Sequence, residues 1–279
     1  MDKRRKTNGW KRHRIQILWA LLTNSYLVGF FQGKIYKGKL KNLCVPGLNC
    51  YSCPGALGAC PIGAMQAVVG NWNFQFAFYV SGFLVFVGAL VGRFACGWLC
   101  PFGLVQELLH KIPFIKKIGA FRGDKLLRKL KYVILLVFVI LLPMVLVDVL
   151  GQGAPYFCKF ICPAGTLEGG IPLVLWNESM QGALGWLYVW KNALLVATIF
   201  LSILIYRPFC KYICPLGAIY SVFNPIAVFR YQVEKETCIG CGACAKACKM
   251  QVNPVESPNH PECIRCGACK RSCPVDAIR

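Results

Sequence analysis

Long apolar stretches alternate with shorter polar segments over the first 230 residues of the chain. Four of these stretches are long enough to cross a hydrocarbon core of about 30 Å, which takes about 20 residues in a helix. They run roughly over residues 15–32, 72–92, 132–151 and 184–206. The pattern therefore predicts an all-α membrane domain with four transmembrane helices.

Basic residues are distributed unevenly between these stretches. Segment 1–14 has seven Lys and Arg, segment 93–131 has nine and the chain after residue 206 has ten, whereas segments 33–71 and 152–183 have four and one. Because Lys and Arg are retained on the cytoplasmic side, both termini are predicted to be cytoplasmic in a multi-pass protein of the cell membrane. The first stretch lacks a small-residue cleavage site, so we expect an uncleaved helix rather than a signal peptide.

Composition narrows the class of protein further. Of 279 residues, 56% are hydrophobic and 15% are charged, and the mean hydropathy is +0.51; soluble domains average about 25% charged residues. The net charge of +21 comes from residues at the ends of the apolar stretches. We therefore expect the protein to interact with the lipid bilayer and not with nucleic acid. The length excludes a small disulfide-rich secreted protein, although the chain has 18 cysteines.

Residues 231–279 are polar and rich in cysteine, and we expect them to form a domain separate from the membrane domain of residues 1–230. Two C-x2-C-x2-C-x3-C runs lie 25 residues apart, with the spacing of bacterial two-cluster ferredoxins, in which the fourth cysteine of each run ligates the other cluster. This predicts a small cytoplasmic α+β ferredoxin domain, with zinc as the alternative. Gly240, Gly242 and Gly267 are expected to let the loops turn tightly. One 4Fe–4S cluster is assigned to Cys238, Cys241, Cys244 and Cys273, and the second to Cys248, Cys263, Cys266 and Cys269.

Four Cys-Pro-x-Gly motifs lie between the apolar stretches. They begin at Cys60, Cys100, Cys162 and Cys214, and the last three have a second cysteine four residues earlier. The order of helix, outer motif, helix and inner motif occurs twice, which predicts two internal repeats that bring like motifs together. The proline suits the first turn of a helix, where free N–H groups favour an anionic cluster. A further cluster is therefore predicted at an inner set of four cysteines, with buried inert thiols as the alternative: Cys96, Cys100, Cys210 and Cys214.

Six more cysteines lie on the outer side of the predicted topology. Cys158 and Cys162 are expected to meet two of Cys44, Cys50, Cys53 and Cys60. Because Cys53 and Cys60 each precede a proline, an outer cluster is predicted at Cys53, Cys60, Cys158 and Cys162. Disulfides in an oxidising compartment are the alternative, although the C-x3-C spacing on a helix suits a disulfide poorly.

With these motifs the sequence resembles the NapH-type membrane ferredoxins, which are related to the membrane parts of NosR, MauN and CcoG-like proteins. The resemblance covers essentially the whole chain and rests on the two inner C-x3-C-P pairs and the eight ferredoxin cysteines. It implies four transmembrane helices and iron–sulfur electron transfer between quinol or a cytoplasmic donor and a redox partner across the membrane. The outer cysteines are additional to the simple NapH pattern.

The sequence shows no Ser/His/Asp set, phosphate loop or open zinc site, so no catalytic residue is assigned. The three histidines, His13, His110 and His260, lie outside the predicted spans, which excludes a bis-histidine haem. Glu107 and His110 either handle protons at a quinone site or belong to an amphipathic helix at the membrane surface. We expect an electron-carrying subunit of an oxidoreductase. The alternative is a maturation factor that supplies electrons for the assembly of a metal site.

Overall fold

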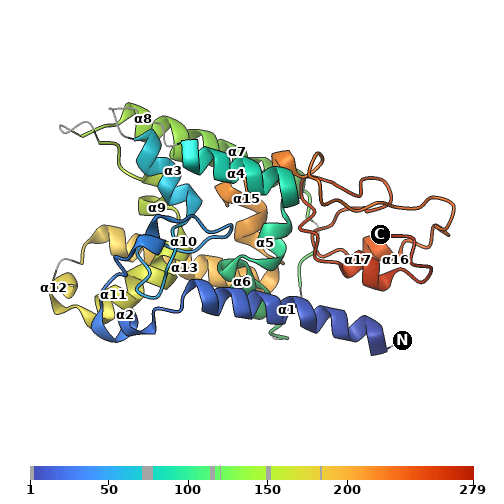
Figure 1. The fold of residues 1–279 in the computed structure, drawn as a ribbon, viewed down its shortest axis with the longest axis horizontal. Coiled ribbons are helices and arrows are strands. Elements are labelled where there is room, and N and C mark those ends of the chain that lie inside the picture. Colours follow the sequence, from blue (N-terminus) through green and yellow to red (C-terminus); the bar gives the residue numbers. More distant parts are fainter. Residues whose placement is uncertain (1–2, 71–77, 114–116, 120, 149–151, 183) are drawn as a thin grey trace.

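The computed structural model describes residues 3–70, 78–113, 117–119, 121–148, 152–182 and 184–279. Two parts lie side by side: a bundle of helices formed by the first 230 residues, and a loop-rich C-terminal unit next to one end of it (Figure 1). The helices of the bundle are α1 (Lys3–Thr23), α2 (Leu27–Gln32), η1 (Lys39–Asn42), α3 (Pro61–Val69), α4 (Phe78–Val91), α5 (Phe94–Trp98), α6 (Pro101–His110), α7 (Asp124–Ile134), η2 (Leu135–Leu141), α8 (Leu142–Val145), α9 (Tyr156–Phe160), α10 (Pro163–Gly165), η3 (Thr166–Gly170), α11 (Ile171–Trp176), α12 (Glu178–Gln181), α13 (Trp186–Leu204), α14 (Pro208–Tyr212) and α15 (Pro215–Phe223).

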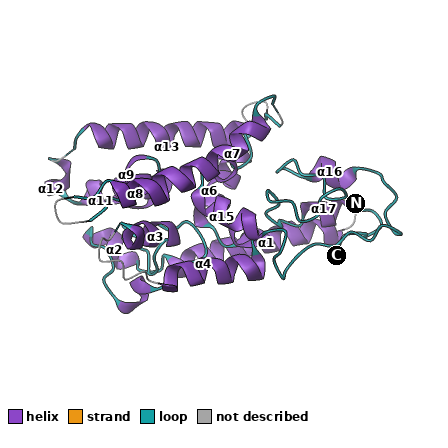
Figure 2. Ribbon diagram, turned by 90° about the horizontal axis from the view of Figure 1, so that it is seen from above, coloured by secondary structure: helices purple, strands orange, loops and turns teal. Residues whose placement is uncertain are grey.

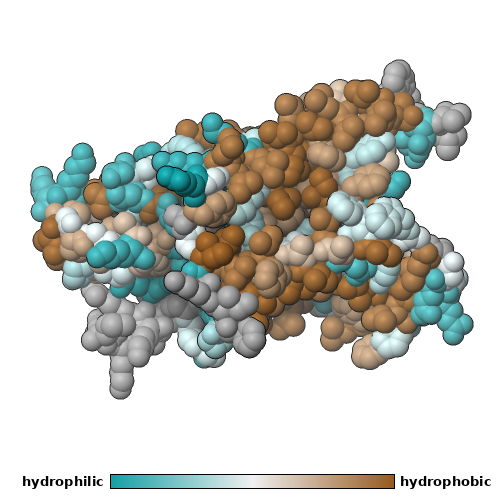
Figure 3. Space-filling view, turned by 180° about the vertical axis from the view of Figure 1, so that it is seen from behind, coloured by the Kyte–Doolittle hydropathy of each residue, from teal (hydrophilic) through white to brown (hydrophobic). Residues whose placement is uncertain are grey.

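Among the described residues, one helix is both long and apolar enough to cross a membrane. This helix is α13, with 19 residues and a mean hydropathy of 1.8. It runs along one side of the bundle in Figure 2. Leu195 and Ser202 are its buried residues, and apolar side chains such as Val189, Val196 and Phe200 are exposed. Figure 3 shows a broad apolar surface on the face seen from behind. The prediction of four transmembrane helices in two repeats is therefore wrong.

The other three apolar stretches are interrupted by local features that hydropathy does not register. Stretch 15–32 is divided between α1 and α2, because the Asn24 side chain donates to the Ala20 carbonyl and the N–H of Tyr26 turns to Gly55. Helix α4 has 14 residues, and residues 72–77 of the second predicted span lie outside the described residues. Stretch 132–151 is divided among α7, the π-helical η2 and α8; Pro143 lacks the N–H that a continuous α-helix needs there, and residues 149–151 lie outside the described residues.

The C-terminal unit has two short helices, α16 (Ala243–Ala247) and α17 (Ala268–Ser272), joined by long loops. Its two ends meet in a single antiparallel bridge between Val233 and Ile278. Asp276, two residues before Ile278, has a left-handed backbone (φ 50°), which limits the extended pairing on that side of the bridge. No strand forms in the described part of the unit, so the expected α+β ferredoxin domain is wrong in its β component.

Candidate metal centres

Each Cys-Pro-x-Gly motif starts a helix in the same way. Cys60, Cys100, Cys162 and Cys214 are N-cap residues in an extended conformation, and the following proline is the first residue of α3, α6, α10 and α15. The prediction that this proline opens a helix is confirmed. In α6 and α15 the N–H of the motif glycine donates to the cysteine Sγ over 3.4 Å. The sulfur therefore lies at the end of the helix that favours negative charge.

The structure brings the four cysteines of the inner set together. All are buried, with exposed fractions of 3–6%. The thiol of Cys214 interacts electrostatically with the other three, and burial raises its pKa well above the usual range. Burial likewise raises the pKa of Cys96. Buried thiols of this kind ionise when a positively charged metal centre is bound, so the donor set fits a thiolate-ligated cluster.

Two buried arginines connect the halves of the inner set. Arg93 precedes Cys96 by three residues and donates to the carbonyl of Cys210 at 3.1 Å. Arg207 precedes Cys210 by three residues and donates to the carbonyl of Cys96 at 2.6 Å. A Cβ added at Gly103 would lie 3.0 Å from Nη1 of Arg207, so the motif glycine leaves room for the guanidinium. The two cations offset the negative charge of four thiolates.

Two buried glutamines that the sequence analysis did not identify each donate a hydrogen bond to one cysteine. Nε2 of Gln106 donates to Sγ of Cys210 at 3.2 Å, and its Oε1 accepts the N–H of the preceding residue. Gln66 makes the same pair of contacts with Cys158, again at 3.2 Å from the sulfur. Each glutamine follows the cysteine of a Cys-Pro-x-Gly motif by six residues. This shared spacing is the signal that could have identified them.

In the C-terminal unit the eight cysteines fall into the two expected groups. One cavity of about 190 Å³ is lined by Cys238, Cys241, Cys244 and Cys273. A second cavity is lined by Cys248, Cys263, Cys266 and Cys269. Gly240, Gly242 and Gly267 have positive φ angles of 66°, 67° and 73°, which confirms that the glycines allow these loops to turn.

None of these groups is a compact site for a single ion. Across the described residues, no three His, Cys, Asp or Glu side chains are close enough together to hold one metal ion. A tetrahedral zinc site needs its ligands on one centre, whereas each thiolate of a cubane binds a different iron.

The outer cysteines are arranged differently from the prediction. Cys53 does not line the cavity; its thiol donates to Oδ1 of Asn24 at 3.6 Å. The structure thus brings three members of the predicted outer set together and turns the fourth away. A cavity of about 1230 Å³ is lined by the other five cysteines of this region, which are Cys44, Cys50, Cys60, Cys158 and Cys162.

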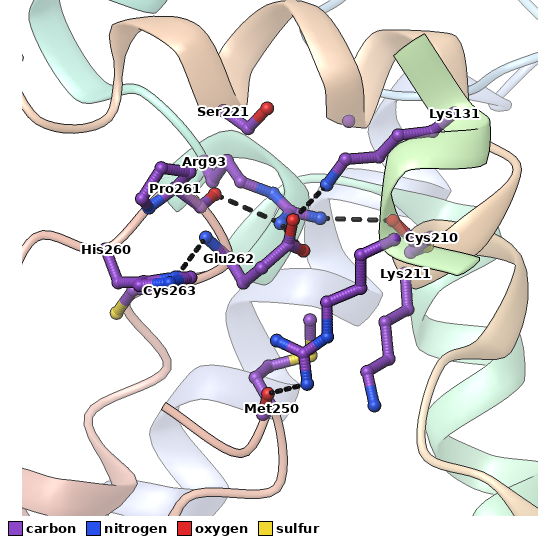
Figure 4. A network of polar contacts seen from close by, with 12 residues as sticks. Arg93, Lys131, Cys210, Lys211, Ser221, Met250, His260, Pro261, Glu262 and Cys263 are labelled. Atoms are coloured by element: carbon purple, nitrogen blue, oxygen red, sulfur yellow. Dashed lines mark hydrogen bonds and ion pairs between the residues drawn. The ribbon is translucent and has the colours of Figure 1, made fainter. Parts of the chain in front are cut away.

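A buried ion network connects the inner set to the C-terminal unit (Figure 4). The Glu262 carboxylate binds Arg93 at 2.6 Å and also binds Lys131. Both cationic side chains are 0% exposed. Burial raises the pKa of Glu262, but the charges of Arg93 and Lys131 outweigh it and lower the pKa to about 2. Because Arg93 also donates to the Cys210 carbonyl, one guanidinium holds both parts.

The backbones of the two parts also touch. A Cβ added at Gly97 would lie 2.2 Å from the carbonyl oxygen of Ile264. Gly97 directly follows Cys96 of the inner set, and Ile264 directly follows Cys263 of the second ferredoxin group. The inner set and this group are therefore neighbours in space.

Glu107 belongs to a separate ion network. It pairs with Arg12 at 2.7 Å and with Arg207 at 3.1 Å, and it accepts the Tyr206 hydroxyl. Burial raises the pKa of Glu107, but Arg207 and Arg12 lower it to about 2. Glu107 is 2% exposed, so it is a buried ion-pair partner and does not lie on the polar face of a surface helix.

Comparison with known proteins adds the following findings. A family model described as a 4Fe-4S binding domain matches residues 58–78, 73–120, 132–171 and 188–232. A second model with the same description matches residues 231–252 and 259–279. No solved structure matches the chain.

Several curated proteins are similar to the chain. An uncharacterized protein of Methanocaldococcus jannaschii is 34% identical over 62% of this chain and 65% of its own length. YccM of Escherichia coli, whose name assigns it to electron transport, is 28% identical over 60% of this chain and 44% of its own length. The methylamine utilization ferredoxin-type protein MauN of Methylorubrum extorquens is 26% identical over 56% of this chain and 47% of its own length. The chain thus spans less than two thirds of these relatives.

Proposed function

Because the chain belongs to the 4Fe–4S binding domain family and is similar to MauN, as its motifs predicted, we propose that it is a membrane-bound iron–sulfur electron-transfer protein. It relays electrons between a cytoplasmic donor or quinol and a membrane or extracytoplasmic redox partner. Two clusters belong to the C-terminal unit and one to the inner set. The names of YccM and MauN, which refer to electron transport and to ferredoxin, support this reading.

The observation that carries the proposal is the contact between Gly97 and Ile264. It joins the loop of Cys96 to the loop of Cys263 through adjacent backbone atoms. Bound clusters would supply one-electron carriers. The chain's own part is to hold the two thiol groups at a fixed short separation, to cover them from solvent and to balance their charge with Arg93 and Arg207.

Membrane attachment rests on α13. Its length matches the bilayer core, and only 11% of its apolar window is buried. We expect the protein to remain with membranes after alkaline carbonate washing. Release by the wash would contradict attachment through α13.

The relay is tested by injecting electrons at the C-terminal unit. A photoreduced low-potential flavin reduces the anaerobic protein, and freeze-quenched electron paramagnetic resonance follows each cluster. The inner-set signal should appear after the ferredoxin signals and should be absent from Cys96→Ala. Cys44→Ala is the matched control, since this buried thiol lies outside both groups. An inner-set signal that never gains an electron from the reduced ferredoxin clusters would contradict the proposal.

A further inference from the structure

A large cavity lies between the loop before α3 and the segment from α9 to α11. It has a volume of about 1230 Å³ and five cysteines in its wall. Ligand pockets typically measure about 300–1,000 Å³, so there is room for a metal cluster and for access to it. All eighteen cysteines lie in the described residues, and none of them is in a disulfide.

Two glycines show which thiols face each other across this cavity. A Cβ added at Gly165 would lie 3.6 Å from Sγ of Cys50. A Cβ added at Gly63 would lie 3.9 Å from Sγ of Cys158. Each of these glycines belongs to a Cys-Pro-x-Gly motif. Each of these two motifs therefore lies next to a cysteine from the opposite segment.

Electrostatic contacts among the thiols give the same grouping. The Cys60 thiol interacts with Cys158 and Cys50, and the Cys162 thiol interacts with Cys158, Cys50 and Cys60. The Cys50 thiol interacts with Cys158 and also with its loop neighbour Cys53, but Cys53 is not among the main partners of Cys60 or Cys162. The Cys53 thiol donates a hydrogen bond to Asn24, and neither residue lines the cavity.

We propose that Cys50, Cys60, Cys158 and Cys162 hold a further 4Fe–4S cluster, and that Cys53 is not a ligand. The site extends the proposed function by adding an electron carrier on the far side of the inner set. Its role in a relay rests on the proposed function, whereas the binding of iron at these four thiols is independent of it.

Two lysines and one amide donor lie around the four thiols, and the Glu168 carboxylate, which accepts the N–H of Cys50 at 2.7 Å, is the acidic group beside them. Lys191 lines the cavity and donates to the carbonyl of Cys158 at 3.2 Å. Lys41, which is 4% exposed, also lines the cavity. Gln66 donates to Sγ of Cys158, the counterpart of the bond from Gln106 to Cys210 in the inner set.

The loop that supplies Cys50 also touches the inner set. A Cβ added at Gly47 would lie 2.9 Å from Cα of Cys100, and the N–H of Leu48 donates to the Cys100 thiol. The buried Tyr220 interacts electrostatically with Cys96 and Cys100 of the inner set and also with Cys60 and Cys44. The two thiol groups are therefore separated by a few buried residues rather than by the thickness of a bilayer.

Iron counting with paired variants tests the assignment. The anaerobically purified wild type should hold about 16 irons per chain, at four per cubane. Cys50→Ala should hold about 12 and lose one cluster signal, whereas Cys53→Ala, three residues away, should keep all 16. Loss of four irons from Cys53→Ala with none lost from Cys50→Ala would overturn the ligand assignment.

A wild type with about 12 irons and disulfide-linked peptides from residues 44–60 and 156–165 would overturn the site itself. Both outcomes are independent of the relay. The inner-set signal after photoreduction should be the same in Cys50→Ala as in the wild type, so a missing inner-set signal in all proteins would count against the proposed function alone.

Discussion

Glu262 is the only carboxylate, within the described residues, that pairs with Arg93 and Lys131, and we expect Glu262→Gln to loosen the C-terminal unit from the bundle. Glutamine keeps the size of the side chain and one acceptor oxygen, but it removes the negative charge. Two fully buried cations are then left without a counter-ion.

The structure sets the magnitude of this effect. Removing one partner of a buried ion pair costs about 3–5 kcal/mol. The fall in the pKa of Glu262 from 4.5 to about 2 corresponds to about 3 kcal/mol, at about 1.4 kcal/mol for each pKa unit. Two independent arguments therefore give about 3 kcal/mol. Since 1.4 kcal/mol is tenfold in an equilibrium constant, the population of the undocked unit should rise by about a hundredfold or more.

Hydrogen exchange measured by mass spectrometry reports this opening. Protection of segment 259–266 should fall by about a hundredfold in Glu262→Gln. The matched control is Glu234→Gln, whose partner Arg279 lies 3.3 Å away at the surface with 75% of its side chain exposed. A surface pair contributes about 0–1 kcal/mol, so protection should fall by less than about fivefold. Equal protection in the two variants would refute the reasoning.

Three further results are expected. Gly97→Ala places a Cβ 2.2 Å from a carbonyl oxygen of the C-terminal unit, and it should slow the arrival of electrons at the inner set in freeze-quench experiments. Gly82→Ala is the control, because a Cβ there has nothing within 4 Å and should leave the rate unchanged. Equal rates in the two variants would argue against the contact. Gln106→Leu removes the N–H donor to Cys210 and should lower the reduction potential of the inner cluster in a redox titration; an unchanged potential would count against this bond. The pKa of Glu107 is lowered from 4.5 to about 2. Its contribution to the free energy of unfolding, about 3 kcal/mol, is therefore complete above pH 4.5 and is lost as the pH falls toward 2. In Glu107→Gln the free energy of unfolding should vary less over this pH range.

The fold was predictable only in part, because hydropathy counts apolar residues and does not register where a helix must end. Stretch 15–32 has the composition of a span, yet the Asn24 side chain and the turn of Tyr26 toward Gly55 divide it. The short pairing at Val233 and Ile278 likewise depends on the left-handed residue Asp276, which no alternation of side chains indicates.

The metal centres were more predictable where the spacing of neighbouring cysteines in the sequence determines which of them group together. The ferredoxin cysteines are grouped by spacing alone, because each loop has too few residues to place them otherwise. Cys50 and Cys53 are three residues apart on one loop, and which of them faces the cavity depends on Asn24, a residue distant in the sequence. Gln66, Gln106 and Arg207 act on cysteines of another segment, so their roles depend on tertiary structure.

The contact between the C-terminal unit and the inner set has a consequence for how the protein is made. Ribosomes synthesise residues 259–266 after both halves of the inner set have been made. With Glu262 paired to Arg93 and Ile264 on Gly97, the side chains of Cys96 and Cys210 are buried. We therefore expect iron to be inserted at these thiols before segment 259–266 docks on the bundle.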